Sequence, residues 1–335
     1  MCAYANTPNK SVIRRCWDQS ILERWYTKIN RPLSYFGLPG PEMHDLLDWR
    51  HLLGVRTGIE SPGHTKKERE QADETIGRLN ANIMQNGLSS GFQLLRADVE
   101  DVIIHSVDSY GTPPQLNDGR PAQVARFKYD VVNLDFDGGL GYKDKSGAAK
   151  RVEAIKKLFE RQEGHDFILL LTINIRDTLG SEIEEYLRNL RGRDRGEGWQ
   201  DILDWYLNRP DGEREYKLKA TVPSFIHASL EPHMFRSRCR PPIVYEGYKH
   251  ARMIHFVFEL ERQPGNLRAF SAQDDRDLIE LPLLRSEMGQ LKFAKMQHPE
   301  INYQQCSTYF DFLPEETRTP ILNTFPRANI PRMSI

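Results

Sequence analysis

Short apolar runs alternate with longer stretches of helical period along the first half of the chain. The apolar runs predict strands at residues 33–36, 55–59, 92–96, 129–134 and 167–173. The last of these runs is apolar throughout, as in a parallel strand that is buried on both faces. Strands and helices that alternate in this way predict an α/β fold with a doubly wound, mostly parallel sheet.

The stretches outside the strands carry apolar residues at helical spacing. An amphipathic helix is expected over residues 11–29, and a second helix is expected to begin at Pro41, because the missing N–H of proline costs nothing there. Two further helices precede the third and the fifth strand. The apolar faces of the four helices, in chain order, comprise Trp17, Ile21, Leu22 and Trp25; Met43, Leu46, Leu47 and Leu53; Ala72, Ile76, Leu79 and Ile83; and Ala148, Val152, Ile155 and Phe159.

The pattern changes after residue 176. Ser181 and Glu184 form a capping box ahead of one helix, and an aromatic helix is expected around Trp199. Two strands at 243–248 and 253–260 are expected to pair antiparallel at the sheet edge. We divide the chain into an N-terminal helical extension (1–30), a cofactor-binding core (31–176), a helical insertion as a substrate-binding arm (177–240), terminal strands of the core (241–262) and a polar C-terminal extension (263–335).

Composition and charge narrow the class of protein. Hydrophobic residues make up 39% of the 335 residues and charged residues 28%, which is typical of a globular chain and not of a disordered one. No stretch approaches the roughly 18 apolar residues of a membrane-spanning helix, so we expect a cytoplasmic protein without a membrane partner. The formal net charge of −1 leaves no global positive field, so any binding of nucleic acid must depend on a local patch.

Polar residues and glycines gather where the predicted strands end. Gly37 and Gly40 follow the first strand, Glu60 follows the second and Asp98 follows the third. Ligands of doubly wound sheets bind outside the carboxyl ends of the strands. Glycines there permit a tight turn and a close approach to the backbone. An acid after the second strand can accept both hydroxyls of an adenosine ribose, and Asp98 is well placed to meet an adenine edge.

These residues carry a family resemblance. The run from Gly37 to Gly139 resembles the cofactor half of class I (Rossmann-fold) S-adenosylmethionine-dependent methyltransferases. Residues 74–88, with their Asn86-Gly87 end, and residues 94–102 are similar to segments of nucleic-acid-modifying members. The resemblance implies a Rossmann-like methyltransferase sheet with an antiparallel edge pair, S-adenosylmethionine as cofactor, and Gly37, Gly40, Glu60 and Asp98 as its ligands. It also implies catalytic roles for Asp135 and Asp137, in the place of the family's fourth motif; the alternative is an acidic turn that caps the next helix.

Two departures from the family pattern leave a second function open. The first strand ends in Tyr35-Phe36 and not in an acid, and the fourth motif has Phe136-Asp137 where the family often carries proline. The main hypothesis is a methyltransferase acting on a nucleic-acid base or another extended substrate. The alternative is a non-catalytic, methyltransferase-like binding or scaffold subunit with a protein partner. A nicotinamide oxidoreductase is a third candidate, but the full Gly-x-Gly-x-x-Gly is absent.

Two arginine clusters suggest where RNA or DNA would bind. Arg191, Arg193 and Arg195 form the first cluster, and Arg236, Arg238 and Arg240 form the second; aromatic residues lie near both. Cations suit phosphates and rings suit bases, so the second cluster is predicted to bind substrate. The alternative is a solvated charged surface, because acidic residues are interleaved in the first cluster.

Other chemistries find little support in the sequence. The four cysteines lie far apart, and the histidines match no zinc motif, so no metal is expected. Asp135 and Asp137 lack an evident third ligand for Mg²⁺. No Gly-x-Ser-x-Gly elbow points to hydrolysis, and no cysteine in the fourth-motif loop offers a nucleophile for cytosine methylation.

Overall fold

The computed structural model describes residues 6–63, 65–105, 128–141, 149–176, 183, 199–263, 278, 281–294 and 308–324. Ten strands form one sheet: β1 (Leu33–Gly37), β2 (Leu53–Glu60), β3 (Phe92–Arg96), β4 (Val131–Asp135), β5 (Phe167–Asn174), β6 (Phe235–Cys239), β7 (Ile243–Glu246), β8 (Arg252–Arg262), β9 (Leu284–Glu287) and β10 (Gln290–Phe293). The helices are α1 (Pro8–Val12), the π-helical η1 (Ile13–Asp18), α2 (Gln19–Ile29), α3 (His44–Asp48), α4 (Lys66–Gln85), α5 (Val99–His105), α6 (Lys150–Gln162), α8 (Trp199–Leu207), α9 (Arg214–Leu230) and α11 (Glu315–Leu322), with short 3₁₀ turns at Asp211–Glu213, Glu231–His233 and Tyr248–His250.

The sheet confirms the predicted fold class. Its strand order is β10-β9-β7-β8-β5-β4-β1-β2-β3, with β6 paired to β8 beside this path. Strands β1 to β5 are parallel, and β8 runs antiparallel to β5. The order 3-2-1-4-5 followed by an antiparallel strand is the Rossmann-like methyltransferase arrangement that the resemblance implied. β7 pairs antiparallel with β8, as predicted. On its other side β7 pairs with β9, so it is not an edge strand of the sheet.

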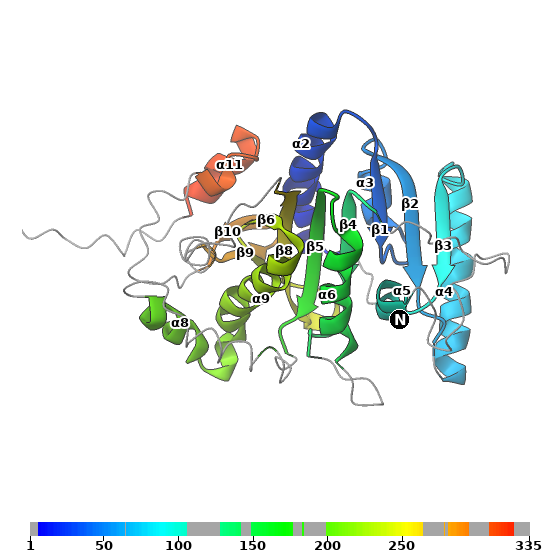
Figure 1. Cartoon of the computed structure of the whole chain (residues 1–335). Coiled ribbons are helices and arrows are strands. Elements are labelled where there is room, and N and C mark those ends of the chain that lie inside the picture. The colour runs from blue at the N-terminus through cyan, green and yellow to red at the C-terminus, as the bar shows by residue number, and fades with distance from the viewer. Residues whose placement is uncertain are drawn as a thin grey trace, which may run out of the picture.

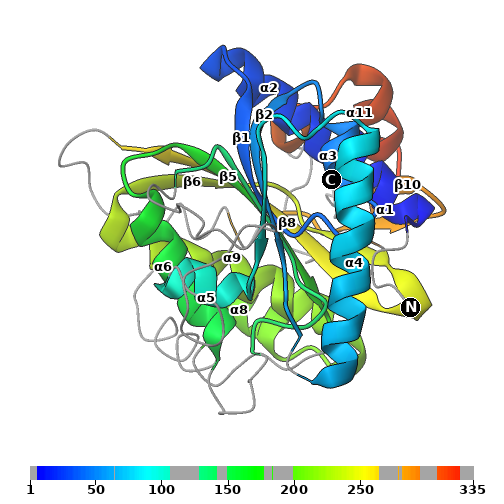
Figure 2. The same cartoon turned by 90° about the vertical axis from the view of Figure 1, so that its right-hand side faces the viewer.

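Helices cover both faces of the sheet (Figures 1 and 2). One buried cluster joins the sheet to α5, α6 and α9, and includes Phe159, Phe167 and Phe256. The other cluster joins the sheet to η1, α2, α3, α4 and α11, and includes Trp17 and Phe310. All four predicted apolar residues of α2 and its preceding turn, and all four of α4, are buried. Amphipathic period therefore identified these helices correctly.

The turn after β1 differs from the prediction. No helix begins at Pro41; α3 begins at His44 and ends at Asp48, and Leu53 lies in β2 instead of on a helical face. Gly40 and Met43 have positive φ angles of 61° and 50°, in the left-handed region that interrupts helix formation. Only a short helix therefore follows β1, and this leaves room at the carboxyl edge for α1 and η1.

Several elements were absent from the sequence-based description. Strands β6, β9 and β10 are short and were not predicted, and neither was α9, which contains Pro223 in its interior. The capping box at Ser181 and Glu184, the residue Ala148 and the first arginine cluster lie outside the described residues. The division into five segments remains a prediction, although β9 and β10 from the last segment belong to the same sheet as the core. In the described part of the chain, no helix is both long and apolar enough to cross a membrane.

Candidate functional site

The carboxyl edge of the parallel strands brings most of the predicted site residues together. Gly37, Glu60 and Asp135 are the last residues of β1, β2 and β4, three strands that are neighbours in the sheet. Asp98 follows β3 by two residues, at the start of α5. Doubly wound sheets bind their ligands along this edge.

The glycine turn after β1 is required by geometry. A side chain at Gly37 would bring its Cβ within 2.5 Å of the backbone oxygen of Asn133 on β4. Gly40 has a φ angle of 61°, which most other residues avoid. The two glycines let β1 lie close to β4 and turn sharply at the carboxyl end of the sheet, where both are buried.

Glu60 is a largely buried carboxyl group without a charge partner. Burial raises the pKa of Glu60 to about 7. Among the described residues, no hydrogen bond or ion pair reaches its carboxylate. Such a group is suited to accept hydrogen bonds from ligand hydroxyls, because a ligand would supply the donors that the chain does not.

Asp98 already has a structural partner. The hydroxyl of Ser61 donates a 2.5 Å hydrogen bond to Asp98 Oδ1, and the Asp98 backbone oxygen accepts from Val102 N at the start of α5. The side chain thus ties the loop after β2 to the loop after β3. It lies at the predicted strand end, and contact with an adenine remains a prediction.

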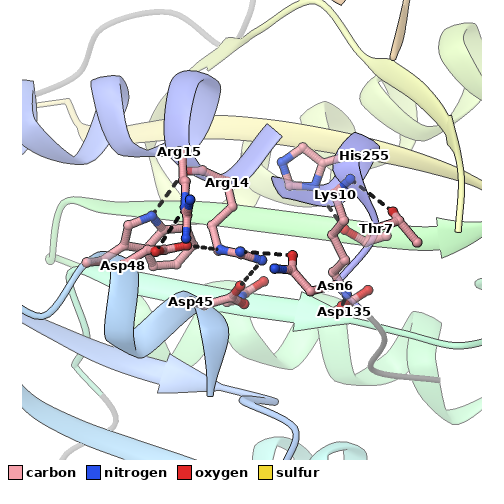
Figure 3. Close-up of polar contacts among 12 residues, drawn as sticks. Asn6, Thr7, Lys10, Arg14, Arg15, Asp45, Asp48, Asp135 and His255 are labelled. Carbon is pink, nitrogen blue, oxygen red and sulfur yellow. Dashed lines mark hydrogen bonds and ion pairs between the residues drawn. The ribbon is translucent and has the colours of Figure 1, made fainter. Parts of the chain in front are cut away.

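Asp135 and Asp137 differ in their surroundings. Asp135 Oδ2 forms an ion pair with Lys10 of α1 (Figure 3), and its side chain is 17% exposed. Burial by itself would lower the pKa of Lys10, but Asp135, Tyr245 and Asp45 outweigh it and raise this pKa above its usual range. The Asp137 side chain is 80% exposed and lies 3.4 Å from Arg151. Only Asp135 is therefore placed within the partly buried edge.

Sequence reasoning missed a polar cluster that joins the N-terminal helices to this edge. We define the polar cluster as Lys10, Arg14, Asp45, Asp48 and Asp135 (Figure 3). Arg14 is buried and pairs with both aspartates of α3. Burial raises the pKa of Asp45, while Lys10 and Arg14 oppose the shift. The sequence signals were two cations four apart and two aspartates three apart.

A second hydrogen-bonded set anchors η1 below the polar cluster. His255 Nε2 lies 2.9 Å from Asp18 Oδ1 of η1, and His255 Nδ1 lies 2.8 Å from the hydroxyl of Thr172 on β5. All three side chains are buried. Thr172 is the register partner of Asp135, so η1 is fixed directly beside the end of β4.

The second arginine cluster does not lie at this edge. Arg236 and Arg238 lie on β6, which pairs with the part of β8 beside the amino end of β5, whereas Asp135 lies at a carboxyl end. Arg240 is only 2% exposed and its Nε donates a 2.6 Å hydrogen bond to Glu259. The second arginine cluster therefore lies away from the proposed cofactor edge, Arg240 is largely paired with Glu259, and substrate binding by this cluster stays a prediction. Strand alternation did not reveal this, because β6 itself was not predicted.

Metal binding has no candidate in the described residues, where no group of three or more histidine, cysteine or acidic side chains could hold an ion.

Comparison with known proteins gives one family and several solved structures. A family model described as PP_RS20740-like matches residues 7–189. No curated protein matches the chain. Trm1 from Pyrococcus horikoshii, solved with S-adenosyl-L-methionine, is similar at 10% identity with a TM-score of 0.42; the match covers 83% of this chain and 60% of Trm1, so this chain spans less than two thirds of that protein.

Two further solved structures are similar to the chain. Magnesium protoporphyrin IX methyltransferase from Synechocystis PCC 6803 with bound SAH has 11% identity and a TM-score of 0.36, with 78% of this chain and 91% of that chain covered. An rRNA methylase from Streptococcus thermophilus has 12% identity and a TM-score of 0.36, with coverage of 72% and 96%.

Proposed function

Because the chain belongs to the PP_RS20740-like family and its sheet has the methyltransferase-type strand order, we propose that it is an S-adenosylmethionine-dependent methyltransferase. The observation that supports this most strongly is the placement of Gly37, Glu60 and Asp135 at the carboxyl ends of three neighbouring strands. Four features that the sequence places far apart, including Asp98, thus lie along the edge where doubly wound sheets bind ligands.

The residues present fit an adenosine-containing cofactor. Glu60 offers a largely buried carboxylate whose hydrogen-bonding capacity no described residue uses, which suits the two hydroxyls of a ribose. The turn from Gly37 to Gly40 would hold the amino-acid part of the cofactor. Asp98, on the loop after β3, would face the adenine.

Asp135 would position the acceptor. S-adenosylmethionine supplies an electrophilic methyl group, and transfer to a nitrogen is an in-line displacement that depends mainly on orientation. Lys10 contacts Asp135 Oδ2, which leaves Oδ1 to accept a hydrogen bond from an acceptor N–H. That bond would aim the nitrogen lone pair at the methyl group, and the carboxylate would then take the released proton.

The proposed acceptor is a nucleic-acid base or another extended substrate. Three cationic side chains lie near the carboxyl end of β5: Arg176, Arg214 and Lys249. Arg214 donates a hydrogen bond to the backbone of Arg176, and Arg176 donates to the backbone of His250, so the three lie close together. Arg176 and Lys249 are exposed and Arg214 is half-buried, and this group beside the end of β5 would contact phosphates of RNA or DNA.

A second candidate function is a non-catalytic binding or scaffold subunit. Its supporting observation is the ion pair of Lys10 with Asp135, since an ammonium group already stands beside the proposed catalytic carboxylate. In this case the protein would bind the cofactor, or a protein partner, without transferring a methyl group.

Calorimetric titration with S-adenosylmethionine and S-adenosylhomocysteine tests the proposal. We expect the wild type to bind both, and Glu60→Ala to weaken both by about tenfold to a hundredfold, since one or two charge-assisted hydrogen bonds are lost. Failure of the wild type to bind at millimolar cofactor would overturn the methyltransferase proposal.

Methyl transfer separates the two candidate functions. With labelled cofactor and pools of RNA, DNA and protein as acceptors, Asp135→Asn should reduce transfer much more than cofactor affinity, because its contact is made in the oriented complex. Glu74→Gln, at an exposed position on α4, is the control and should change neither. Cofactor binding without transfer to any pool would favour the scaffold.

The nucleic-acid acceptor has its own test. Replacing Arg176, Arg214 and Lys249 by alanine should flatten the slope of log affinity for RNA against log salt by up to about three units, if each side chain contacts a phosphate. An unchanged slope would assign the substrate to another class.

A further inference from the structure

A cavity of about 570 Å³ lies near the amino end of β5, whereas the proposed cofactor site lies at the carboxyl ends of the parallel strands. Its walls come from α2, β6 and β8 and from residues near the C-terminal end. β6 and β8 meet here beside the amino end of β5 (Figure 1). Its volume falls within the range of small-molecule sites, about 300–1,000 Å³.

Positive charge dominates the lining. Five cationic side chains, Arg24, Lys28, Arg236, Arg238 and Arg240, share the cavity with two carboxylates, Glu259 and Glu261, which leaves three positive charges in excess. An excess of this size in a concave site attracts anions.

The two carboxylates are already engaged. Arg24 and Arg240 both pair with Glu259, and Lys28 Nζ lies 2.8 Å from Glu261. The side chains of Arg236 and Arg238 are exposed on β6 and have no ion pair or hydrogen bond to any described residue. They are thus the two guanidinium groups of the cavity that a ligand would pair with.

The pKa of Arg240 is affected by the excess of positive charge in the cavity. Burial, with smaller contributions from the neighbouring Arg24 and Arg238, lowers the pKa of Arg240 to about 10 against the opposing effect of Glu259. A buried cation that is repelled by two others would gain from an added anion.

Uncharged hydrogen-bond donors for a ligand are found at Ser237 of β6, whose only described neighbour in the sheet is β8. Met234 O and Arg240 N bond to β8, so in this antiparallel pair the even-numbered residues face β8 and the backbone groups of Ser237 project from the other edge. The Ser237 hydroxyl is buried, lines the cavity and has no hydrogen-bond partner among the described residues. A buried hydroxyl in this state is available to a ligand.

The other side of the lining is mostly apolar or aromatic. Leu278, Leu281, Trp25 and Tyr309 line it together with His227, Cys239 and Thr308. Inorganic phosphate alone would fill only a small part of 570 Å³. The ligand must therefore carry a planar or apolar part besides its anionic group.

We propose that this cavity is a binding site for a small organic phosphate of nucleotide size, separate from the methyl-transfer site. Its phosphate would pair with Arg236 and Arg238 and accept from the Ser237 hydroxyl, since guanidinium forks match phosphate oxygens. Its ring or apolar portion would lie against the leucines and Tyr309.

Calorimetric titration of the full chain with ADP, adenosine and pyrophosphate tests the site. We expect ADP to bind, pyrophosphate to bind more weakly, and the double variant Arg236→Ala/Arg238→Ala to lose affinity for ADP by at least about tenfold per arginine. Both side chains are exposed, so the variant should keep the wild-type melting temperature. The double variant Arg50→Ala/Lys67→Ala removes the same charge from exposed positions away from the cavity and should bind ADP normally.

The adenosine part of ADP could also enter the cofactor edge, and Glu60→Ala distinguishes the two sites. Binding to the cavity should survive this substitution and should add to, not compete with, binding of S-adenosylmethionine. The proposal fails if neither ADP nor pyrophosphate binds the wild type at millimolar concentration, if the arginine variant binds both unchanged, or if Glu60→Ala alone abolishes ADP binding.

Discussion

Burial is the cause that shifts the pKa of Glu60. Its carboxyl group has an ordinary pKa of 4.5, and burial raises that pKa to about 7 in the folded protein. Between these values the folded state binds a proton that the unfolded chain has released. The contribution of Glu60 to stability is therefore fully present below about pH 4.5 and is lost as the pH rises through 7.

This sign leads to a prediction for Glu60→Gln. The neutral amide never carries the buried charge, so the variant should melt at a higher temperature than the wild type at pH 8. The difference should shrink toward zero as the pH falls to about 5. Thermal unfolding followed by circular dichroism at both pH values measures it, with exposed Asp137→Asn as a control that should show no such trend. A variant less stable than the wild type at pH 8 would show that Glu60 has a stabilising partner.

Glu259 is expected to be the most costly carboxylate to neutralise. It accepts from Trp25 Nε1 at 2.7 Å and pairs with Arg240, and both members of that ion pair are nearly fully buried. Glu259→Gln leaves a buried guanidinium without its counter-charge and should lower the free energy of unfolding by about 3–5 kcal/mol. Glu261→Gln, two residues along β8 and half exposed, should cost less than about 1 kcal/mol. Urea denaturation compares the two, and equal losses would contradict this account.

Site residues at strand ends could be predicted from the sequence, whereas contacts between residues far apart in the chain could not. Glu60 and Asp135 could be found because a strand end is marked by local pattern. The pairing of Lys10 with Asp135 joins residues 125 positions apart, and no local pattern encodes it. The burial of Arg240 could not be predicted for the same reason, since it depends on Glu259.

At the scale of elements, the N-terminal helical run is held by aromatic contacts with the C-terminal part of the chain. Trp17 of η1 is fully buried, and its ring packs edge-on against Phe312 at 4.8 Å and Phe310 at 6.0 Å. Trp17→Ala should lower the free energy of unfolding by about 3–5 kcal/mol, the usual cost of removing a large aromatic side chain from a core. Met288→Ala, at a position 95% exposed, is the control for simple truncation. A loss below 1 kcal/mol for the tryptophan would mean that these contacts carry little energy.

Elements with strong period could be predicted, and elements defined by tertiary contacts could not. α4 shows its apolar face and its capping box at Thr65 and Glu68 in the sequence. β9 and β10 are four residues each and form because β7 offers a free edge. α9 is buried along most of its length, so it lacks the polar face that marks an amphipathic helix.

At the scale of the whole molecule, the last segment completes the sheet and is not an appendage. Leu284 and Phe293 of the β9–β10 hairpin belong to the same buried cluster as Trp17. A chain ending at residue 263 would lose this hairpin and α11, and would expose the edge of β7. We expect it to aggregate or to lose its cooperative thermal transition, as measured by size-exclusion chromatography and circular dichroism. A chain ending at residue 324 keeps every described element and should behave as the full chain does; similar behaviour of the shorter one would show that the core is complete without the hairpin.

The N-terminal helices contact residues that are translated late, and this limits the order in which the protein can fold during synthesis. Asp18 pairs with His255, 237 residues away, and Asn9 accepts from the backbone of Gly289, 280 residues away. These partners leave the ribosome only when most of the polypeptide has been made. Strands β1 to β5 can assemble earlier, but Trp17 then lacks Phe310 and Phe312, and Trp25 lacks Glu259, so both rings are incompletely covered. The nascent chain therefore carries a partly exposed aromatic helix through most of its synthesis, which makes it a natural client for a chaperone.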